Sequence, residues 1–379
     1  MAFHKQTIED LDLHSQTVLV RVDYNVPMED GVITDDYRIK KSLPTIQYLL
    51  DRNCRVVLCS HLGRPEGPDD KQFSLAAVSQ RLSELLEKPV AFATDCVGYE
   101  RNQKVQSLDQ GAVLLLENLR FHHEEEENND DFARDLAQDI NIFVQDAFGA
   151  AHRAHASTEA VTRHVQHAVA GFLLRDEVDI LTRVITEPDR PLMAIIGGKK
   201  IADKIEILRR FIDVADRVVV CGAMANTFLE AQGVSVGKSL VEEDDIPLAR
   251  EIVDLAHRKQ ADQADFVFYL PVDGVVATEI SDHVKPRVVE WNAHDLGELQ
   301  SYPNIPPCEA SEVAEDEIIL DIGPLSAEYI SGLMRGMHTV VWNGAPGVTE
   351  IEAPRSKVGP FEHGTHRIVQ AMLGDEPFG

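Results

Sequence analysis

Basic side chains stand directly after several short apolar runs in the first half of the sequence. Each of these runs has the composition of a buried strand, and the residues that follow it are unusually polar. Guanidinium groups bind carboxylate and phosphate groups in a planar, two-pronged manner. A single arginine of this kind would usually be a surface residue, but several at successive strand ends predict a site for a small molecule that carries both anionic groups. The candidate residues are Asp23, Asn25, Arg38, His61, Arg64, Arg120 and Arg153.

The second half of the sequence places glycines and lysines at the corresponding positions. Gly197-Gly198-Lys199-Lys200 follows one apolar run and leads into a predicted helix that bears Asp203 and Lys204. Bare glycine amides at a helix start, next to lysines, can cradle a phosphate group. Gly222-Ala223-Met224 follows the next run with residues small enough to admit a flat base, and Asn343–Glu350 follows a third. Each segment alone would usually be a simple turn, but together they predict a nucleotide site that faces the arginine site.

Two further patterns are weak. The run Gly233–Ser239 resembles a P-loop, but it has three residues between its glycines where the motif requires four, and it follows a helical pattern rather than a strand. His152 and His155 are spaced like metal ligands, but no carboxylate or cysteine set completes a zinc site. We therefore expect neither segment to bind phosphate or zinc.

These side chains require a scaffold that gathers strand ends, and the pattern of the chain predicts one. Short apolar runs alternate with helical patterns along the whole sequence, which is typical of buried parallel sheets in the α/β class. Ligands of open α/β sheets bind at the carboxyl ends of the strands. The predicted strands are Thr17–Val22, Arg55–Cys59, Ala112–Leu116, Asn141–Val144, Leu192–Ile196, Arg217–Cys221, Phe266–Leu270, Glu317–Leu320 and Thr339–Trp342.

Helical periodicity separates these strands. One predicted helix is capped by Ser74, and another extends from Lys200 to about Ala215. A third, Phe172–Ile185, is expected to connect two domains within a stretch, Ala156–Arg190, that has no strong strand. The acidic run Glu124–Glu127 is expected to be a solvated helix start, where acidic residues suit the helix dipole.

Bulk properties exclude several classes of protein. A length of 379 residues suggests two domains, and a net charge of −28 argues against a nucleic-acid partner because it would repel a phosphate backbone. The sequence has no stretch of about 18 apolar residues that could span a membrane, and its N-terminus does not resemble a secretion signal. The cysteines follow no metal-ligand spacing, so we expect free thiols in a reducing cytoplasm. They are Cys54, Cys59, Cys96, Cys221 and Cys308.

Several segments resemble, in order and spacing, the motifs of the phosphoglycerate kinase family across nearly the whole of residues 1–365. The matching segments are Val20–Pro27, Ser60–Pro65, Leu116–Phe121, Asp146–Gly149, His152–Ser157, Asp203–Ile205, Gly237–Leu240, Leu270–Asp273 and Val341–Gly344.

This resemblance implies a fold and an activity. It implies an α/β protein of two Rossmann-like parallel-sheet domains that face a deep cleft and are joined by a hinge helix. Residues 1–170 would bind 3-phosphoglycerate, residues 171–187 would form the interdomain helix and linker, and residues 188–379 would bind the nucleotide. The implied reaction is reversible phosphoryl transfer between 1,3-bisphosphoglycerate and Mg-ADP, giving 3-phosphoglycerate and ATP in glycolysis or gluconeogenesis. The resemblance further implies a cytoplasmic monomer with hinge bending.

The resemblance also implies residue roles. The seven residues of the first half named above would bind 3-phosphoglycerate, and Arg38 and Lys200 would stabilise charge during transfer without a covalent intermediate or a general base. Magnesium would accompany the nucleotide, and no metal ligand is assigned in this chain because the family's magnesium aspartate is expected in an absent segment. The nucleotide residues would be Gly197, Lys200, Lys204, Gly222, Asn343 and Glu350.

Some positions depart from the family pattern. Cys221 and Ala223 stand where the family usually has glycines, and Lys199 replaces a small residue, which could alter the fit of the base. The chain ends at Gly379, before the family's glycine-rich phosphate loop. We therefore expect an incomplete second domain and a poor or inactive kinase. The alternatives are a truncated, non-catalytic homologue that binds phosphoglycerate or another anion, and an unrelated nucleotide-dependent ligase.

Overall fold

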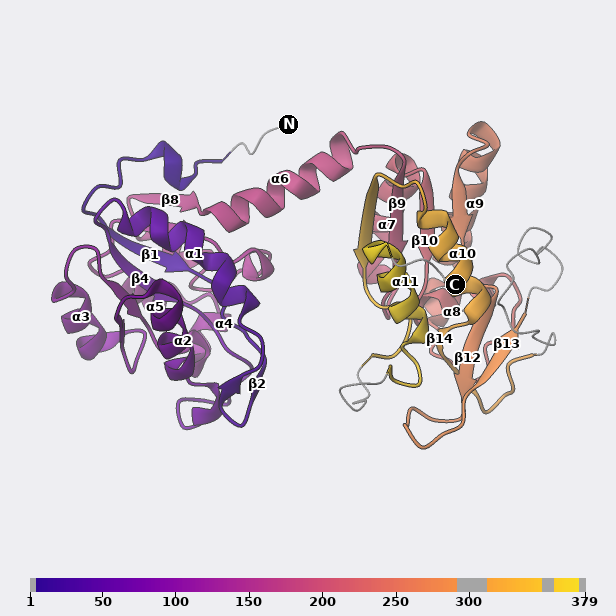
Figure 1. Ribbon diagram of the computed structural model, residues 1–379, viewed down its shortest axis with the longest axis horizontal. Helices are drawn as coiled ribbons and strands as arrows, with labels where there is room; N and C mark the ends of the chain where they lie inside the picture. Colours follow the sequence, from indigo (N-terminus) through magenta and orange to yellow (C-terminus); the bar gives the residue numbers. More distant parts are fainter. Residues whose placement is uncertain (1–4, 292–311, 350–357, 375–379) are drawn as a thin grey trace. The chain divides into compact units, whose positions relative to one another are not determined.

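The computed structural model describes residues 5–291, 312–349 and 358–374. The chain divides into two compact units, Met1–Arg183 and Val184–Gly379 (Figure 1). The division falls within helix α6 (Phe172–Thr186), which continues from one unit into the other. This helix coincides with the predicted connecting helix, and the predicted domain limits at residues 170 and 187 stay a prediction.

Unit 1 is built on one six-stranded sheet with the strand order β5-β6-β4-β1-β7-β8. Every neighbouring pair is parallel, so the carboxyl ends of all six strands lie along the same edge. The strands are β1 (Thr17–Arg21), β4 (Arg55–Cys59), β5 (Val90–Phe92), β6 (Val113–Leu115), β7 (Ile142–Gln145) and β8 (His167–Ala170).

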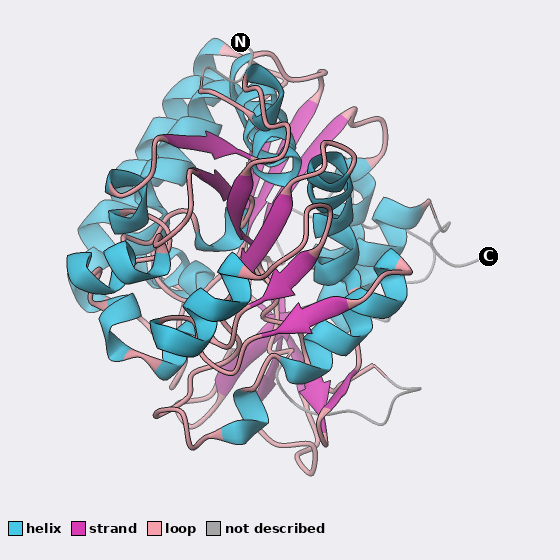
Figure 2. Ribbon diagram, turned by 90° about the vertical axis from the view of Figure 1, so that its left-hand side faces the viewer, coloured by secondary structure: helices cyan, strands magenta, loops and turns pink. Residues whose placement is uncertain are grey.

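Helices cover both faces of this sheet, and its strands are therefore buried on both sides (Figures 1 and 2). Along β1, Val18 and Val20 pack into one apolar cluster with α1 and α2, while Leu19 packs into a second cluster with α3 and α5. This alternation follows from the two-residue period of a strand. The helices are α1 (Tyr37–Leu50), α2 (Ala76–Leu86), α3 (Gly98–Gln106), α4 (His123–Glu126) and α5 (Asp130–Leu136).

Short elements complete unit 1. A small antiparallel hairpin pairs β2 (Met28–Glu29) with β3 (Val32–Ile33). Five 3-10 turns lie in the loops of this unit, and two of them follow strands of the main sheet. They are η1 (Ile8–Asp10), η2 (Lys71–Phe73), η3 (Leu119–Phe121), η4 (Phe148–Ala150) and η5 (Ala160–Arg163).

Unit 2 contains a four-stranded parallel sheet and a three-stranded antiparallel sheet. The parallel sheet has the order β11-β10-β9-β15, and the antiparallel sheet has the order β13-β12-β14. The strands are β9 (Leu192–Ile196), β10 (Arg217–Val220), β11 (Val267–Tyr269), β12 (Asp273–Ala277), β13 (Arg287–Glu290), β14 (Ile318–Ile322) and β15 (Thr339–Asn343).

Helices again cover the two faces of the parallel sheet of unit 2. One apolar cluster joins the sheet to α7, α8 and α9, and another joins it to α10 and α11. The helical elements are η6 (Ala202–Lys204), α7 (Ile205–Val214), α8 (Met224–Ala231), η7 (Glu243–Asp245), α9 (Ile246–Asp262), α10 (Pro324–Met334) and α11 (His363–Leu373).

The α/β class and the nine predicted strands are confirmed, but three details of the prediction were wrong. Strand β8 lies inside the stretch expected to lack one, because its exposed first residues His167 and Ala168 weaken its apolar signal. Strand β14 pairs in an antiparallel sheet, not a parallel one. The helix expected from Lys200 begins at Ile205, after the short turn η6.

Within the described part of the chain, no helix combines the length and the apolar character that crossing a bilayer requires. The four cysteines in that part, Cys54, Cys59, Cys96 and Cys221, are buried free thiols. Cys308 lies outside the described residues.

Candidate functional site

The loops that follow β1 and β4 are joined by side chains from the predicted substrate site. Asn25 Oδ1 accepts a hydrogen bond from the Gly63 amide at 2.8 Å, and Arg38 Nη1 lies 2.7 Å from Asp23 Oδ2. Gly63 has a φ of +60°, and a Cβ there would lie 2.2 Å from the ring of Phe73. The loop therefore requires glycine at this position for both conformation and space.

Arg120 reaches the same loop from the next strand of the sheet. It lies in η3, directly after β6, and is buried. Its Nη1 donates to the Gly63 carbonyl at 2.7 Å, and its Nη2 lies 2.9 Å from Glu126 Oε1. Asn118 ties the two loops together further, because its amide nitrogen donates to the carbonyls of Leu62 and Phe73. The strand-end loops thus form a connected, rigid edge.

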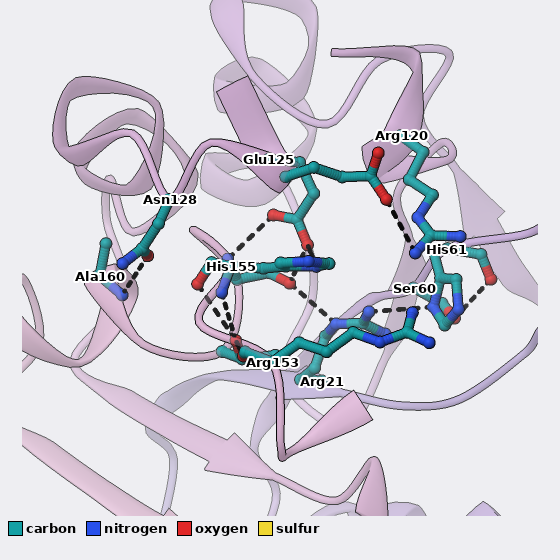
Figure 3. Close-up of polar contacts among 12 residues, drawn as sticks. Arg21, Ser60, His61, Arg120, Glu125, Asn128, Arg153, His155 and Ala160 are labelled. Carbon is teal, nitrogen blue, oxygen red and sulfur yellow. Dashed lines mark hydrogen bonds and ion pairs between the residues drawn. The ribbon is translucent and has the colours of Figure 1, made fainter. Parts of the chain in front are cut away.

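His61 lies among the arginines of this edge (Figure 3). Burial and, to a lesser extent, the positive charges of Arg21, Arg120, Arg153 and Arg38 together lower the pKa of His61 to about 2. These arginines come from β1, η3, the loop after η4 and α1. His61 is therefore a neutral imidazole among cations, and the site attracts an anion without needing a charged histidine.

The basic residues differ in exposure. Arg38, Arg64 and Arg153 are exposed, whereas His61 and Arg120 are buried. Arg64 directly follows Gly63, and Arg153 Nε lies 3.4 Å from His152 Nε2. The structure thus places all the predicted basic residues at the carboxyl edge of the unit 1 sheet. The exposed guanidinium groups remain available for a ligand.

Sequence reasoning missed a buried group of polar residues beneath this edge. Arg21 is only 1% exposed and donates to Ser157 Oγ at 2.8 Å. Ser157 in turn donates to Glu125 Oε1 at 2.6 Å, and its amide donates to Glu125 Oε2 at 2.9 Å. An arginine inside an otherwise apolar strand was the signal that could have revealed this group, because a buried guanidinium requires partners.

The prediction for Glu125 was wrong. The acidic run does start a helix, α4, but Glu125 is fully buried rather than solvated. The reason is that one face of this short helix packs against the loop that carries Ser157, where the carboxylate accepts two hydrogen bonds.

In unit 2, three glycine loops pack backbone against backbone at the carboxyl ends of β9, β10 and β15. A Cβ on Gly197 would lie 2.6 Å from the Gly344 carbonyl oxygen, and one on Gly222 would lie 2.7 Å from the Gly198 amide nitrogen. Gly222 and Gly344 also have φ values of +69° and +88°. Side chains at these positions would force the loops apart, so the glycines allow a closely packed backbone surface.

A pocket of about 580 Å³ opens beside these loops. Its lining combines small and apolar residues with one lysine, and mostly apolar pockets with a few polar groups are typical of small-molecule sites. The lining includes Lys199, Gly222, Ala223, Leu229, Pro346 and Thr349.

Two buried carboxyl groups, Asp273 and Asp321, also line the pocket. Burial raises the pKa of Asp273 to about 6 and that of Asp321 to about 7. In each group, both oxygens accept hydrogen bonds from backbone amides. The donors to Asp273 are the amides of Leu325 and Ser326. The donors to Asp321 are the amides of Ile322 and Gly364. These carboxylates hold loops and helix ends in place and do not offer free metal ligands.

The other predicted nucleotide residues lie around the same loops. Lys200 is exposed, and the side chain of Lys204 approaches Gly198, whose Cβ would lie 3.7 Å from the Lys204 Nζ atom. The Asn343 carbonyl accepts the Gly197 amide at 2.8 Å. Gly197, Lys200, Lys204 and Asn343 do not line the pocket, whereas Gly222 does. Glu350 lies outside the described residues.

The P-loop-like run follows helix α8 and not a strand, as its preceding helical pattern predicted. Ser239 accepts the Ile319 amide at 2.8 Å, so the run tethers β14. Among the described residues, the side chains of Asp95, Cys96 and His122 form the one grouping with metal-ligand spacing. Asp95 and His122 already pair at 2.8 Å, and burial raises the pKa of the Cys96 thiol well above its usual range. This grouping is therefore a poor metal site.

Comparison with known proteins gives a consistent result. The model of the phosphoglycerate kinase family matches residues 8–377. A phosphoglycerate kinase of Moorella thermoacetica is 46% identical over 97% of this chain and 86% of its own length, and one of Aquifex aeolicus is 42% identical over 97% and 85%. The solved structure of phosphoglycerate kinase from Coxiella burnetii is similar with a TM-score of 0.72 and 38% identity, covering 98% of this chain and 86% of that chain. That from Pyrococcus horikoshii has a TM-score of 0.74 and 29% identity, covering 99% and 87%.

Proposed function

The chain belongs to the phosphoglycerate kinase family, and from this membership we propose that it transfers a phosphoryl group reversibly between 1,3-bisphosphoglycerate and Mg-ADP. The products are 3-phosphoglycerate and ATP. The observation that supports this function most strongly is the basic edge of unit 1, where four arginines surround a neutral His61. Such an edge suits a small molecule with both carboxylate and phosphate groups.

The substrate residues have distinct parts in this proposal. Arg64, Arg120 and Arg153 bind the anionic groups of 3-phosphoglycerate with His61, while Asp23 and Asn25 order the loop that carries them. Arg38, held 2.7 Å from Asp23, is free to turn toward the transferred phosphoryl group because half of its side chain is exposed. The charge of its guanidinium would stabilise the equatorial oxygens in the transition state.

The glycine loops of unit 2 and the adjacent pocket would bind the nucleotide. Gly197 and Gly222 leave room for close approach to the backbone, and Lys200 and Lys204 supply positive charge for the phosphates. Asn343 lies on the neighbouring loop, and Glu350 is proposed to bind the ribose. Magnesium enters as part of the nucleotide substrate, because the pocket carboxylates Asp273 and Asp321 are committed to backbone amides.

Direct transfer requires only that the bound substrates meet in line. The carboxylate of 3-phosphoglycerate is already an adequate nucleophile, so no general base or covalent intermediate is needed. We further propose that the protein acts as a cytoplasmic monomer, which agrees with its buried free thiols. A non-catalytic anion-binding homologue is not favoured, because relatives named phosphoglycerate kinase match nearly the whole chain.

The test is a coupled assay of ATP consumption by the purified chain with and without 3-phosphoglycerate. The departures from the family pattern predicted a poor or inactive kinase, but relatives named phosphoglycerate kinase match nearly the whole chain, so we expect turnover that depends on both substrates and on magnesium. We expect Lys200→Ala to abolish most of it. Lys238→Ala is the matched control, because Lys238 is also exposed in unit 2 but lies in the P-loop-like run. A protein that binds 3-phosphoglycerate in calorimetry but shows no turnover would instead be the binding homologue.

A further inference from the structure

A continuous hydrogen-bond network of buried polar groups ends on His61 (Figure 3). It begins at Glu125, which is fully buried and accepts two hydrogen bonds from Ser157. Ser157 Oγ accepts the Nε hydrogen of Arg21 at 2.8 Å, and Arg21 Nη2 lies 3.0 Å from His61 Nδ1. These contacts join residues that are as far as 136 positions apart in the sequence.

The opposite charges of Glu125 and Arg21 within this series of hydrogen bonds explain why Arg21 can be buried. A guanidinium removed from water is costly unless an anion and hydrogen-bond acceptors compensate it. Glu125 supplies the anion through the Ser157 hydroxyl, and the Val22 carbonyl accepts from Arg21 Nη1 at 2.5 Å. Because Nε, Nη1 and Nη2 each have a fixed partner, the planar guanidinium has only one orientation.

The contact between Arg21 and His61 determines the position of the histidine proton. Arginine has donors and no acceptors, so His61 Nδ1 must be the acceptor in this contact. An imidazolium, with hydrogens on both nitrogens, would place two donors against each other. The neutral ring must therefore carry its proton on Nε2. The groups that face His61 support a neutral ring, because Arg21, Arg120, Arg153 and Arg38 are all cations.

We propose that Arg21 is a positioning residue for substrate binding: it holds His61 as the neutral tautomer with hydrogen on Nε2, so that this hydrogen is presented to an anionic oxygen of 3-phosphoglycerate. Glu125 and Ser157 hold Arg21 in turn. The role in substrate binding rests on the proposed function, whereas the tautomer does not.

The first test reads the tautomer directly. In protein labelled with ¹⁵N-histidine, His61 is assigned among the 15 histidines by the loss of its signals in His61→Gln. Long-range ¹H–¹⁵N correlations should show an unprotonated Nδ1 and a protonated Nε2 throughout about pH 5.5 to 8, where an ordinary histidine titrates. Arg21→Met removes the donors but keeps an unbranched side chain in the same space, and we expect the single tautomer to be lost in favour of a mixture.

A control separates this effect from general destabilisation. Arg101 is also fully buried in unit 1, but it donates to the carbonyls of Leu136 and Gln138. Arg101→Met should lower stability without changing the His61 signals. If Arg21→Met does not fold, Ser157→Ala serves in its place, because it removes the acceptor of Arg21 Nε and should produce a weaker shift in the same direction. An unchanged tautomer in whichever of these two variants is folded overturns the proposal.

The second test concerns binding. Losing a hydrogen bond to a charged group corresponds to roughly 10-fold or more in affinity, so Arg21→Met should raise the KM for 3-phosphoglycerate by that factor. The KM for MgATP and kcat should change much less. His61→Gln places an amide nitrogen where Nε2 was and should retain most of the affinity, whereas His61→Asn places it near Nδ1 and should not. Equal losses in both histidine variants overturn the assignment of Nε2 as the substrate donor.

The two tests also distinguish this proposal from the proposed function. If His61 shows the expected tautomer and loses it in Arg21→Met, yet its signals do not respond to 3-phosphoglycerate, then the pairing stands and the substrate site is wrong. If wild-type protein turns over both substrates but His61 carries its proton on Nδ1, the positioning role of Arg21 is wrong and the kinase function stands.

Discussion

At the scale of single residues, the arginines of unit 1 have different freedom to act. Arg120 is buried and held by the Gly63 carbonyl and by Glu126, so its guanidinium has a fixed position at the edge of the sheet. Arg38 has a side chain that is 49% exposed and makes one ion pair, with Asp23. Such a surface ion pair contributes little stability. Arg38 can therefore leave its partner at little cost and meet a transferred group.

We predict that Arg38→Ala lowers kcat by roughly 10³-fold or more, the scale on which an arginine stabilises phosphoryl transfer. The KM for 3-phosphoglycerate should change much less, because the other arginines still bind it. Steady-state kinetics check this, and Arg134→Ala is the control because Arg134 in α5 is also about half exposed and pairs with nearby aspartates. Near-normal turnover in Arg38→Ala would remove this residue from the mechanism.

A second prediction at this scale concerns Gly222. Alanine there would adopt an unfavourable positive φ and also press against the Gly198 backbone and the Ala345 carbonyl. We expect Gly222→Ala to weaken ADP binding at least about tenfold, since strain of this kind costs about 1–3 kcal/mol, while 3-phosphoglycerate binding stays the same. Calorimetry with each ligand measures this.

Gly233→Ala is the matched control for Gly222→Ala. Gly233 also has a positive φ, +85°, but a Cβ there meets no atom within 4 Å. It therefore reports the cost of the conformation without the clash. Similar loss of ADP affinity in the two variants would contradict the view that close packing of the glycine loops forms the nucleotide site.

At the scale of elements, the start of α6 is held by the buried carboxyl group of Asp146, in the loop that follows β7. Asp146 Oδ1 accepts the amides of Leu173 and Leu174 at 2.9 and 3.3 Å. Burial nevertheless raises the pKa of Asp146 to about 7. The loop that begins at Asp146 also leads to Arg153, so one residue connects the substrate edge to the helix that continues into unit 2.

The raised pKa of Asp146 predicts in which direction the free energy of unfolding changes with pH. A carboxyl group whose pKa is higher in the folded than in the unfolded state favours folding while it is protonated, and this contribution is lost as the pH rises through about 7. The free energy of unfolding of unit 1 should therefore fall between about pH 4 and 7, by up to about 1.4 kcal/mol per pH unit from this group. Asp146→Asn keeps an oxygen acceptor but cannot ionise, so its slope should be flatter.

Urea unfolding at a series of pH values measures this slope. Asp69→Asn is the control, because Asp69 is exposed in the same unit and should leave the slope unchanged. Parallel curves for wild type and Asp146→Asn would show that Asp146 is already ionised in the folded protein at pH 4.

The elements themselves were largely predictable from the sequence. Strands such as β4 and β9 are continuous apolar runs because both of their faces are buried, and their bounds were predicted to the residue. Strand β8 was missed because its first two residues are exposed at the sheet edge. Strand β14 was found, but its antiparallel pairing was not, since periodicity reports burial and says nothing about the partner strand.

The candidate site divides along similar lines. Exposed or semi-exposed polar residues after strands, such as Arg38 and Arg64, could be predicted because the topology rule places them at one edge. Arg21 and Glu125 could not, because their roles depend on contacts between distant segments. The acidic run around Glu125 even predicted that this residue is solvated, whereas it is buried. Which buried charged residues lie close enough to compensate each other depends on the tertiary fold, and the spacing along the sequence does not reveal it.

At the scale of the whole molecule, the net charge of the chain is opposite in sign to the local charge at the proposed substrate edge. The chain carries a net charge of −28, yet the proposed substrate edge is cationic, which suits an anionic ligand. The mutual repulsion of surface carboxylates opposes the compact state, whereas the attraction of the arginine edge for an anion is local. Dissolved salt screens both interactions, but their signs differ.

We therefore predict opposite effects of salt on stability and on binding. Between 10 and 150 mM NaCl the screening length falls from about 30 Å to about 8 Å. The urea midpoint should rise, while the Kd for 3-phosphoglycerate should increase severalfold. Arg64→Ala should show weaker binding with a smaller salt dependence, and the same rise in midpoint. A Kd independent of salt would mean that charge does not govern binding at this edge.

The glycine loops of unit 2 also constrain how this sequence can evolve. Around Gly197, Gly222 and Gly344, the nearest neighbours of an added Cβ are backbone atoms. Gly63 in unit 1 is different, because its added Cβ would meet the ring of Phe73, a side chain that mutation can shorten. A genetic selection for suppressors should recover changes at Phe73 that partly rescue Gly63→Ala, because they remove the clash but not the strain of the φ of +60°. For Gly222→Ala no neighbouring side chain can be trimmed, and only reversion to glycine should restore growth.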